Sequence, residues 1–232
     1  MKNIINFAKE RKKEFIILGI SFILFLILSI LVIMEKVVYL DTLVHSFILD
    51  IRNDSLTSFF NIITNLAGAS FLLALSVIML IVMKKKKISL YVLINLISAF
   101  IINETAKAIF TRSRPVGINL IDETGFSFPS GHTMVALSFY GFIVFLLYNK
   151  TKNKAMRMFF IIGLIAVVLL VGFSRIYLGV HYLSDVIGGL LLSIMYLTIF
   201  INFVKLEKKW LYESNRNYCW IQSFSFRTFV SN

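Results

Sequence analysis

Two side chains suited to nucleophilic catalysis stand four residues apart, His181 and Asp185, in the segment SRIYLGVHYLSD of residues 174–185. If both belong to the start of one helix, this spacing places them on the same face. A carboxylate that accepts a hydrogen bond from one imidazole nitrogen fixes the tautomer and leaves the other nitrogen as a nucleophile or base. The alternative is a pair that only caps the helix.

A second segment, Phe128-Pro129-Ser130-Gly131-His132, precedes a long apolar run. Pro129 and Gly131 discourage a continuous helix here, and Ser130 is a plausible N-cap with its hydroxyl turned toward free backbone N–H groups. A helix N-terminus with a Gly, a Ser and a His suits the oxygens of a phosphate. Taken alone, His132 is more often structural than catalytic.

Cations accompany both segments: Lys107, Arg112, Arg114 and Arg175. Phosphoryl transfer spreads negative charge over three equatorial oxygens, so preset cations and hydrogen-bond donors perform most of the catalysis. The adjacent carboxylates Asp122 and Glu123 do not form a two-metal cluster, which needs several ligands from different segments. We therefore expect no required metal and no cofactor.

The elements that position these residues are membrane helices. With 58% hydrophobic residues, 16% charged residues and a mean hydropathy of +0.84, the chain is too apolar for an ordinary water-soluble domain. The uncharged run Phe15–Met34 alone would span roughly 30 Å as a helix. Six such runs predict an all-α polytopic membrane protein: Phe15–Met34, Ser55–Met83, Ile88–Asn103, Thr133–Asn149, Met158–Ser174 and Val186–Val204.

Topology follows from the basic residues, which accumulate in cytoplasmic loops. They precede the first run, join the second to the third and the fourth to the fifth, and follow the sixth, which predicts that both termini are cytoplasmic. The net charge of +12 therefore lies between apolar runs, and we expect a bilayer rather than nucleic acid as partner. The outer face then receives residues 35–54, 104–132 and 175–185.

The first outer segment, residues 35–54, alternates charged with apolar side chains and is predicted to be an amphipathic interfacial element. It either covers a site or merely packs. Lys107, Arg112, Arg114 and Arg175 are exceptions to the scarcity of cations on outer loops, and such exceptions indicate an anionic ligand.

Together, Lys107-x6-Arg114-Pro115, Pro129-Ser130-Gly131-His132 and Ser174-Arg175-x5-His181-x3-Asp185 resemble the three-part signature of the type 2 phosphatidic acid phosphatase superfamily. The motifs span residues 107–185, and the six-helix pattern extends the resemblance over roughly residues 14–204. Short six-helix bacterial members are lipid phosphatases, including phosphatidylglycerophosphate phosphatases and undecaprenyl diphosphate phosphatases.

The resemblance implies a role for each residue. His181 would attack phosphorus, Asp185 would orient it, and His132 would protonate the leaving lipid oxygen and later activate water. The phosphate would be bound by Lys107, Arg114, Ser130, the Gly131 backbone N–H and Arg175. Arg112 matches no fixed position of the pattern, and we expect it to contact a headgroup or the surface.

The sequence thus predicts a basic cytoplasmic N-terminus (residues 1–13), a membrane phosphatase domain (14–204) and a cytoplasmic tail (205–232). The single cysteine, Cys219, has no partner for an internal disulfide. The substrate stays open among phosphatidylglycerophosphate, undecaprenyl diphosphate and phosphatidate, because phosphate-binding residues recognise what these lipids share. A membrane transporter, which would place its ionisable residues near the bilayer midplane, and a vanadate-dependent haloperoxidase are the alternatives.

Overall fold

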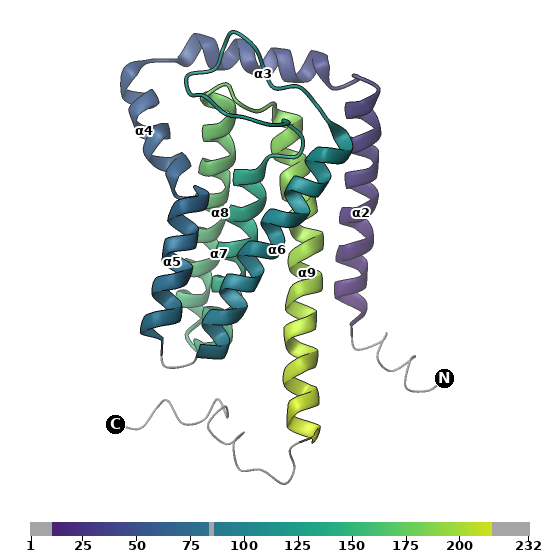
Figure 1. The fold of residues 1–232 in the computed structure, drawn as a ribbon, viewed down its shortest axis with the longest axis vertical. Helices are drawn as coiled ribbons and strands as arrows, with labels where there is room; N and C mark the ends of the chain where they lie inside the picture. The colour runs from purple at the N-terminus through teal and green to yellow at the C-terminus, as the bar shows by residue number, and fades with distance from the viewer. Residues whose placement is uncertain (1–10, 84–85, 215–232) are drawn as a thin grey trace.

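The computed structural model describes residues 11–83 and 86–214, with side chains as far as Glu207, and the regular secondary structure of this part is all α-helix (Figure 1). Five helices are individually long and apolar enough to cross a membrane, and a bent pair supplies a sixth span. The predicted all-α, six-span fold is confirmed. The elements are α2 (Lys12–Ile33), α3 (Val38–Ile51), α4 (Asp54–Asn65), α5 (Ala69–Val82), α6 (Lys86–Phe110), α7 (Gly131–Lys150), α8 (Lys154–Tyr177) and α9 (Leu183–Ser214).

The second predicted span, Ser55–Met83, is not one helix. It consists of α4 and α5, inclined by 43° across the break at residues 66–68. Gly68 has an extended conformation, with φ −63° and ψ 135°, and precedes the first residue of α5. The helix is interrupted here because a residue with an extended backbone cannot continue the helical hydrogen-bond ladder. It places Thr64, in the last turn of α4, against α8.

Helix α3 is the predicted interfacial segment, and Figure 1 shows it lying across one end of the bundle. Its buried polar residues, Asp41 and His45, are four apart and share one face. Apolar residues on the helix, such as Leu43 and Phe47, are exposed. The polar face therefore points into the protein, and of the two roles left open for this segment the structure shows that it covers the bundle end.

The main core lies between α5, α6, α7, α8 and α9, while α2 packs along α9. Many large apolar side chains on the outer faces of these helices are exposed, as expected where lipid is the solvent. The helix that contains the sixth predicted span, α9, continues beyond Val204 to Ser214. Predictions that concern Cys219 and residues 215–232 fall outside the described residues.

The two ends of the bundle differ in charge and in chemistry. Helices α6 and α8 end, and α7 and α9 begin, at the end covered by α3 (Figure 1). The basic residues of the predicted cytoplasmic loops, such as Lys86, Lys150 and Lys154, lie at the opposite end. All three signature segments consequently meet at one end of the protein.

Candidate active site

The catalytic pair predicted from the sequence is in contact, although His181 is not helical. Nδ1 of His181 lies 3.4 Å from Oδ2 of Asp185, and α9 begins only at Leu183. The expectation that both residues share a helix face was wrong. Helix α8 ends in a turn in which the Arg175 carbonyl accepts from the N–H groups of Val180 and His181, and Gly179 has a positive φ of 73°. That turn delivers His181 to the carboxylate.

The other imidazole nitrogen faces a cation: Nε2 of His181 lies 3.2 Å from Nη1 of Arg114. Arg114 only donates, so Nε2 carries the lone pair and Nδ1 carries the proton that faces Asp185. Burial lowers the pKa of His181 to about 4; Asp185 opposes this shift, and the charges of Arg175 and Arg114 add to it. The ring is therefore neutral near pH 7, as a nucleophile requires.

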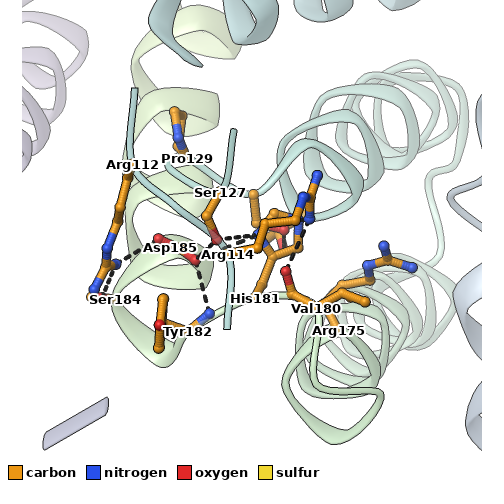
Figure 2. Close-up of polar contacts among 12 residues, drawn as sticks. Arg112, Arg114, Ser127, Pro129, Arg175, Val180, His181, Tyr182, Ser184 and Asp185 are labelled. Atoms are coloured by element: carbon orange, nitrogen blue, oxygen red, sulfur yellow. Dashed lines mark hydrogen bonds and ion pairs between the residues drawn. The ribbon is translucent and has the colours of Figure 1, made fainter. Parts of the chain in front are cut away.

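Asp185 is fully buried and accepts several hydrogen bonds (Figure 2). Its Oδ2 accepts from the Ser127 hydroxyl at 2.5 Å and from the Tyr182 backbone N–H at 2.8 Å. Its Oδ1 accepts from Nη1 of Arg112 at 2.6 Å. A buried carboxylate needs such donors, because without them its desolvation would be costly.

The expectation for Arg112 was wrong, since it does not serve as a surface or headgroup contact. Its side chain is 14% exposed, and Nη2 also binds Oδ2 of Asp41 on α3 at 2.8 Å. The guanidinium stacks over the ring of Tyr182, 4.3 Å from its centroid. Asp41 and Arg112 are 71 residues apart, and their sequence surroundings carry no sign of this pairing.

Arg175 is almost completely buried at the end of α8. Its Nη1 donates to Oγ1 of Thr64 at 2.7 Å, and its Nη2 pairs with the carboxylate of Glu123. Nε of Arg175 finds no partner among the described residues. Nε of Arg175 is thus free to bind a ligand, whereas Nη2 is already bound to the carboxylate of Glu123.

Arg114 connects the loop between α6 and α7 to the turn that carries His181. Its Nε and Nη2 donate to the carbonyl oxygens of Gly125 and Thr124, at 3.0 and 2.9 Å, and Nη1 donates to that of Val180 at 2.9 Å. These bonds hold the guanidinium beside His181. Figure 2 shows Arg112 and Arg114 on opposite sides of the Asp185–His181 pair.

Lys107, in the last turn of α6, reaches the start of α7. A Cβ atom at Gly131 would lie 3.5 Å from Nζ of Lys107 and 2.9 Å from Oδ1 of Asn103, so a larger residue would crowd this approach. Nζ pairs with Glu104 at 2.9 Å. Glycine at this position therefore lets an ammonium lie close to the helix N-terminus.

Ser130 is the N-cap residue of α7, as predicted, but its hydroxyl makes no capping hydrogen bond. Instead it accepts from Oγ1 of Thr133 at 3.0 Å. The backbone N–H of Ser130 donates to the carbonyl of Asp185 at 2.9 Å, which joins the starts of α7 and α9. His132 lies in the first turn of α7, half-buried, within the electrostatic influence of Arg175, His181, Lys107 and Arg114.

All eight residues predicted for the site therefore gather at the same end of the bundle. Over residues 11–83 and 86–207, no group of three or more His, Cys, Asp or Glu side chains is arranged to hold a metal ion. Sequence reasoning missed four contributors: Asp41, Thr64, Glu123 and Ser127. Their identity depends on which helices pack together, and only the position of Ser127 next to Phe128-Pro129 offered a clue.

Comparisons with known proteins point to one family. Residues 88–209 match the model of the PAP2 superfamily. The chain is 36% identical over 181 residues to phosphatidylglycerophosphatase B of Bacillus subtilis, covering 75% of this chain and 88% of the relative. It is 33% identical over 124 residues to undecaprenyl-diphosphatase of Sulfolobus acidocaldarius, covering 50% of this chain and 55% of that protein.

A solved structure also resembles this fold. It is the crystal structure of a transmembrane PAP2-type phosphatidylglycerolphosphate phosphatase from Bacillus subtilis, with a TM-score of 0.75 and 31% identity. The superposition covers 81% of this chain and 96% of the other. The similarity therefore extends well beyond the signature segments at residues 107–185.

Proposed function

Since the chain belongs to the PAP2 superfamily and is a membrane lipid phosphatase, we propose that it transfers the phosphate of its lipid first to Nε2 of His181 and then to water. The observation that carries this proposal is the imidazole of His181 held between the Asp185 carboxylate and the Arg114 guanidinium. One partner orients the ring, and the other is placed to bind the phosphate that the ring attacks.

In the first step, Nε2 of His181 forms a bond to phosphorus while the bond from phosphorus to the lipid oxygen breaks. His132 supplies the proton that this oxygen takes up, so the lipid leaves as an alcohol, or as a monophosphate when the substrate is a diphosphate. The phosphorylated ring still carries the proton on Nδ1 and is cationic. The Asp185 carboxylate, 3.4 Å from that nitrogen, compensates the charge.

In the second step, water attacks phosphorus and the P–N bond breaks. His132, which lost its proton in the first step, accepts a proton from the water, and His181 returns to the neutral form. The products are inorganic phosphate and the dephosphorylated lipid. Both steps require only groups of this chain and water, in keeping with the expectation that no metal is needed.

The phosphate oxygens would be bound by Lys107, Arg114, Arg175, Ser130 and the Gly131 N–H. The unpartnered Nε of Arg175 supports this assignment, because a buried donor without an acceptor is well suited to a substrate oxygen. The Glu123 carboxylate is bound to Arg175 where we place the phosphate. A substrate therefore competes with this carboxylate for Arg175.

We propose phosphatidylglycerophosphate as the main substrate, since the relative that is 36% identical is named a phosphatidylglycerophosphatase. Undecaprenyl diphosphate is the second candidate, supported by the relative named for that activity. We place the site at the outer membrane face and both termini in the cytoplasm, because the Lys-rich loops lie at the end opposite to the site.

A substrate panel tests this function. Phosphate release by the purified protein would be measured with phosphatidylglycerophosphate, undecaprenyl diphosphate, phosphatidate and diacylglycerol diphosphate, with His181→Ala as the inactive control. The expected order of kcat/KM places phosphatidylglycerophosphate first. A preference for the isoprenoid diphosphate would reassign the substrate, and equal phosphate release by His181→Ala would remove the proposed nucleophile.

A further inference from the structure

Arg112 and Asp41 connect the interfacial helix α3 to the catalytic pair, and we propose that they are positioning residues that set the orientation and charge of Asp185 and His181. This inference rests on the proposed role of His181 as the nucleophile. Neither residue touches the proposed phosphate site, so both would act through Asp185.

The geometry around Arg112 leaves its guanidinium little freedom. One nitrogen binds Oδ1 of Asp185 at 2.6 Å and the hydroxyl of Ser184 at 2.7 Å, and the other binds Oδ2 of Asp41 at 2.8 Å. The Tyr182 ring covers one face of the plane. A planar fork with fixed donors can hold two carboxylates at defined angles, whereas the flexible ammonium of a lysine cannot.

Helix α3 also contacts the segment from His181 to Ser184 directly. Oδ1 of Asp41 accepts from the backbone N–H of Ser184 at 3.0 Å, and Oδ2 accepts from the Ser184 hydroxyl at 2.6 Å. One helical turn later, Nε2 of His45 lies 3.2 Å from the carbonyl oxygen of His181. Burial lowers the pKa of His45, so its neutral ring can donate this hydrogen bond. Helix α3 thus forms hydrogen bonds on both sides of Tyr182, to His181 and to Ser184.

The charges of this network explain why an acid accompanies the arginine. Asp41 and Asp185 are both buried and share one guanidinium, which leaves a net negative charge beside the neutral His181. Asp41 balances Arg112, so the Asp185 charge stays available to the phosphorylated, cationic ring. Without Asp41, Arg112 would oppose that cation; without Arg112, two buried carboxylates would lack a counter-charge.

The two substitutions should therefore move the protonation of His181 in opposite directions. Arg112→Ala removes a cation and favours the protonated ring, which raises the pKa of His181. Asp41→Asn leaves the Arg112 charge unbalanced and lowers that pKa. His181 is surrounded by titratable and charged groups from every element packed against it. These groups are Asp41 and His45 of α3, Arg112 and Arg114 of the loop between α6 and α7, His132 of α7, Arg175 of α8, Tyr182, and Asp185 of α9.

The experiment measures kcat and KM for phosphatidylglycerophosphate across pH 3.5–9 with purified full-length Arg112→Ala, Arg112→Lys and Asp41→Asn. Both Arg112 variants should lose kcat, by about 10- to 100-fold as for other residues that orient an active-site ligand, with little change in KM. The acid limb of kcat/KM should move to higher pH in Arg112→Ala and to lower pH in Asp41→Asn. If Arg112 and Asp41 were needed only for folding, their substitutions would not shift the acid limb of kcat/KM in opposite directions.

Matched controls come from the same chain. Arg157→Ala removes an arginine that stacks on Tyr148 at 4.5 Å, similar to the Arg112–Tyr182 stack but at the other end of the bundle. Asp50→Asn removes an exposed carboxylate from α3 itself. Both controls should keep the wild-type acid limb, because neither side chain touches the Asp185 network.

A cavity of about 490 Å³ reaches Arg112 and allows a chemical rescue. Its lining includes Asp41, Arg112 and Tyr182. Millimolar guanidinium should restore part of the kcat lost in Arg112→Ala but not that lost in His181→Ala, which also separates this proposal from the proposed function. Wild-type kcat in Arg112→Ala, or shifts of the same sign in both variants, would overturn the proposal. If Arg112→Ala does not fold, Asp41→Asn decides alone: an acid limb that fails to move to lower pH refutes it.

Discussion

Glu123 gives the sharpest test of where the phosphate binds. Its carboxylate pairs with Arg175, the buried cation that we assign to the phosphate, and its charge also attracts Arg114. An anion that enters the site competes with this carboxylate for Arg175. Glu123→Gln removes the negative charge while an amide of the same length can still accept a hydrogen bond from Arg175, so the substitution weakens the competitor and preserves the shape of the site.

The magnitude follows from the burial of the two partners. Arg175 is 1% exposed and Glu123 26% exposed, so the pair is only partly screened by water. Hydrogen bonds to charged groups contribute about 1.5–3 kcal/mol, and the partial exposure of Glu123 favours the lower limit. Since 1.4 kcal/mol corresponds to a factor of ten, vanadate and inorganic phosphate should inhibit Glu123→Gln at concentrations about tenfold lower than the wild type.

The assay compares inhibition constants for vanadate and phosphate in wild type, Glu123→Gln and Asp122→Asn. Asp122 is the exposed neighbouring carboxylate, and its removal tests the effect of charge without the contact. We expect Asp122→Asn to change inhibition by less than about twofold and only at low salt, because exposed charges are screened. Weaker anion inhibition in Glu123→Gln, or equal effects of both substitutions, would refute the assignment of Arg175 to the phosphate site.

The remaining predictions concern the reaction and the topology. Rapid quenching with radiolabelled lipid phosphate should trap an acid-labile, base-stable phosphoenzyme in the wild type and none in His181→Ala. Equal labelling of His181→Ala would make His132 the next candidate for the nucleophile. The His132→Ala variant should lose about a hundredfold in rate, and the loss should be greatest with poor leaving groups. Because the pKa of His181 is lowered to about 4, the nucleophile should stay deprotonated down to that range, and an acid limb of kcat/KM near the ordinary histidine value of 6.5 would contradict this. Activity should persist in EDTA and be inhibited by vanadate; inactivation reversed by magnesium or manganese would show that a metal is needed. After replacement of Cys219 by Ser, single cysteines in residues 84–87 and next to His132 should label from opposite sides of the membrane, and labelling from the same side would exclude the proposed topology.

The sequence by itself determined the class of the protein and most of its site. Uncharged runs long enough to cross a bilayer and basic loops between them can be recognised without knowing any contact, because lipid imposes these requirements on each segment separately. The same holds for the three signature segments. Lys107, Arg114, His132 and His181 were found from local patterns, and the ordering of the helices places them at one end of the bundle.

Only the tertiary structure decided how these residues are supported. The partners of Arg112 and Arg175 come from segments 71 and 52 residues away, Asp41 and Glu123, and no local pattern connects them. The placement of His181 in a turn rather than in a helix likewise depends on how α8 ends. Spacing along the chain predicts contacts within one regular element, whereas contacts of loop side chains depend on which helix ends the packing brings together. For this reason the sequence identified the candidate catalytic groups, and only the fold showed the network that holds them.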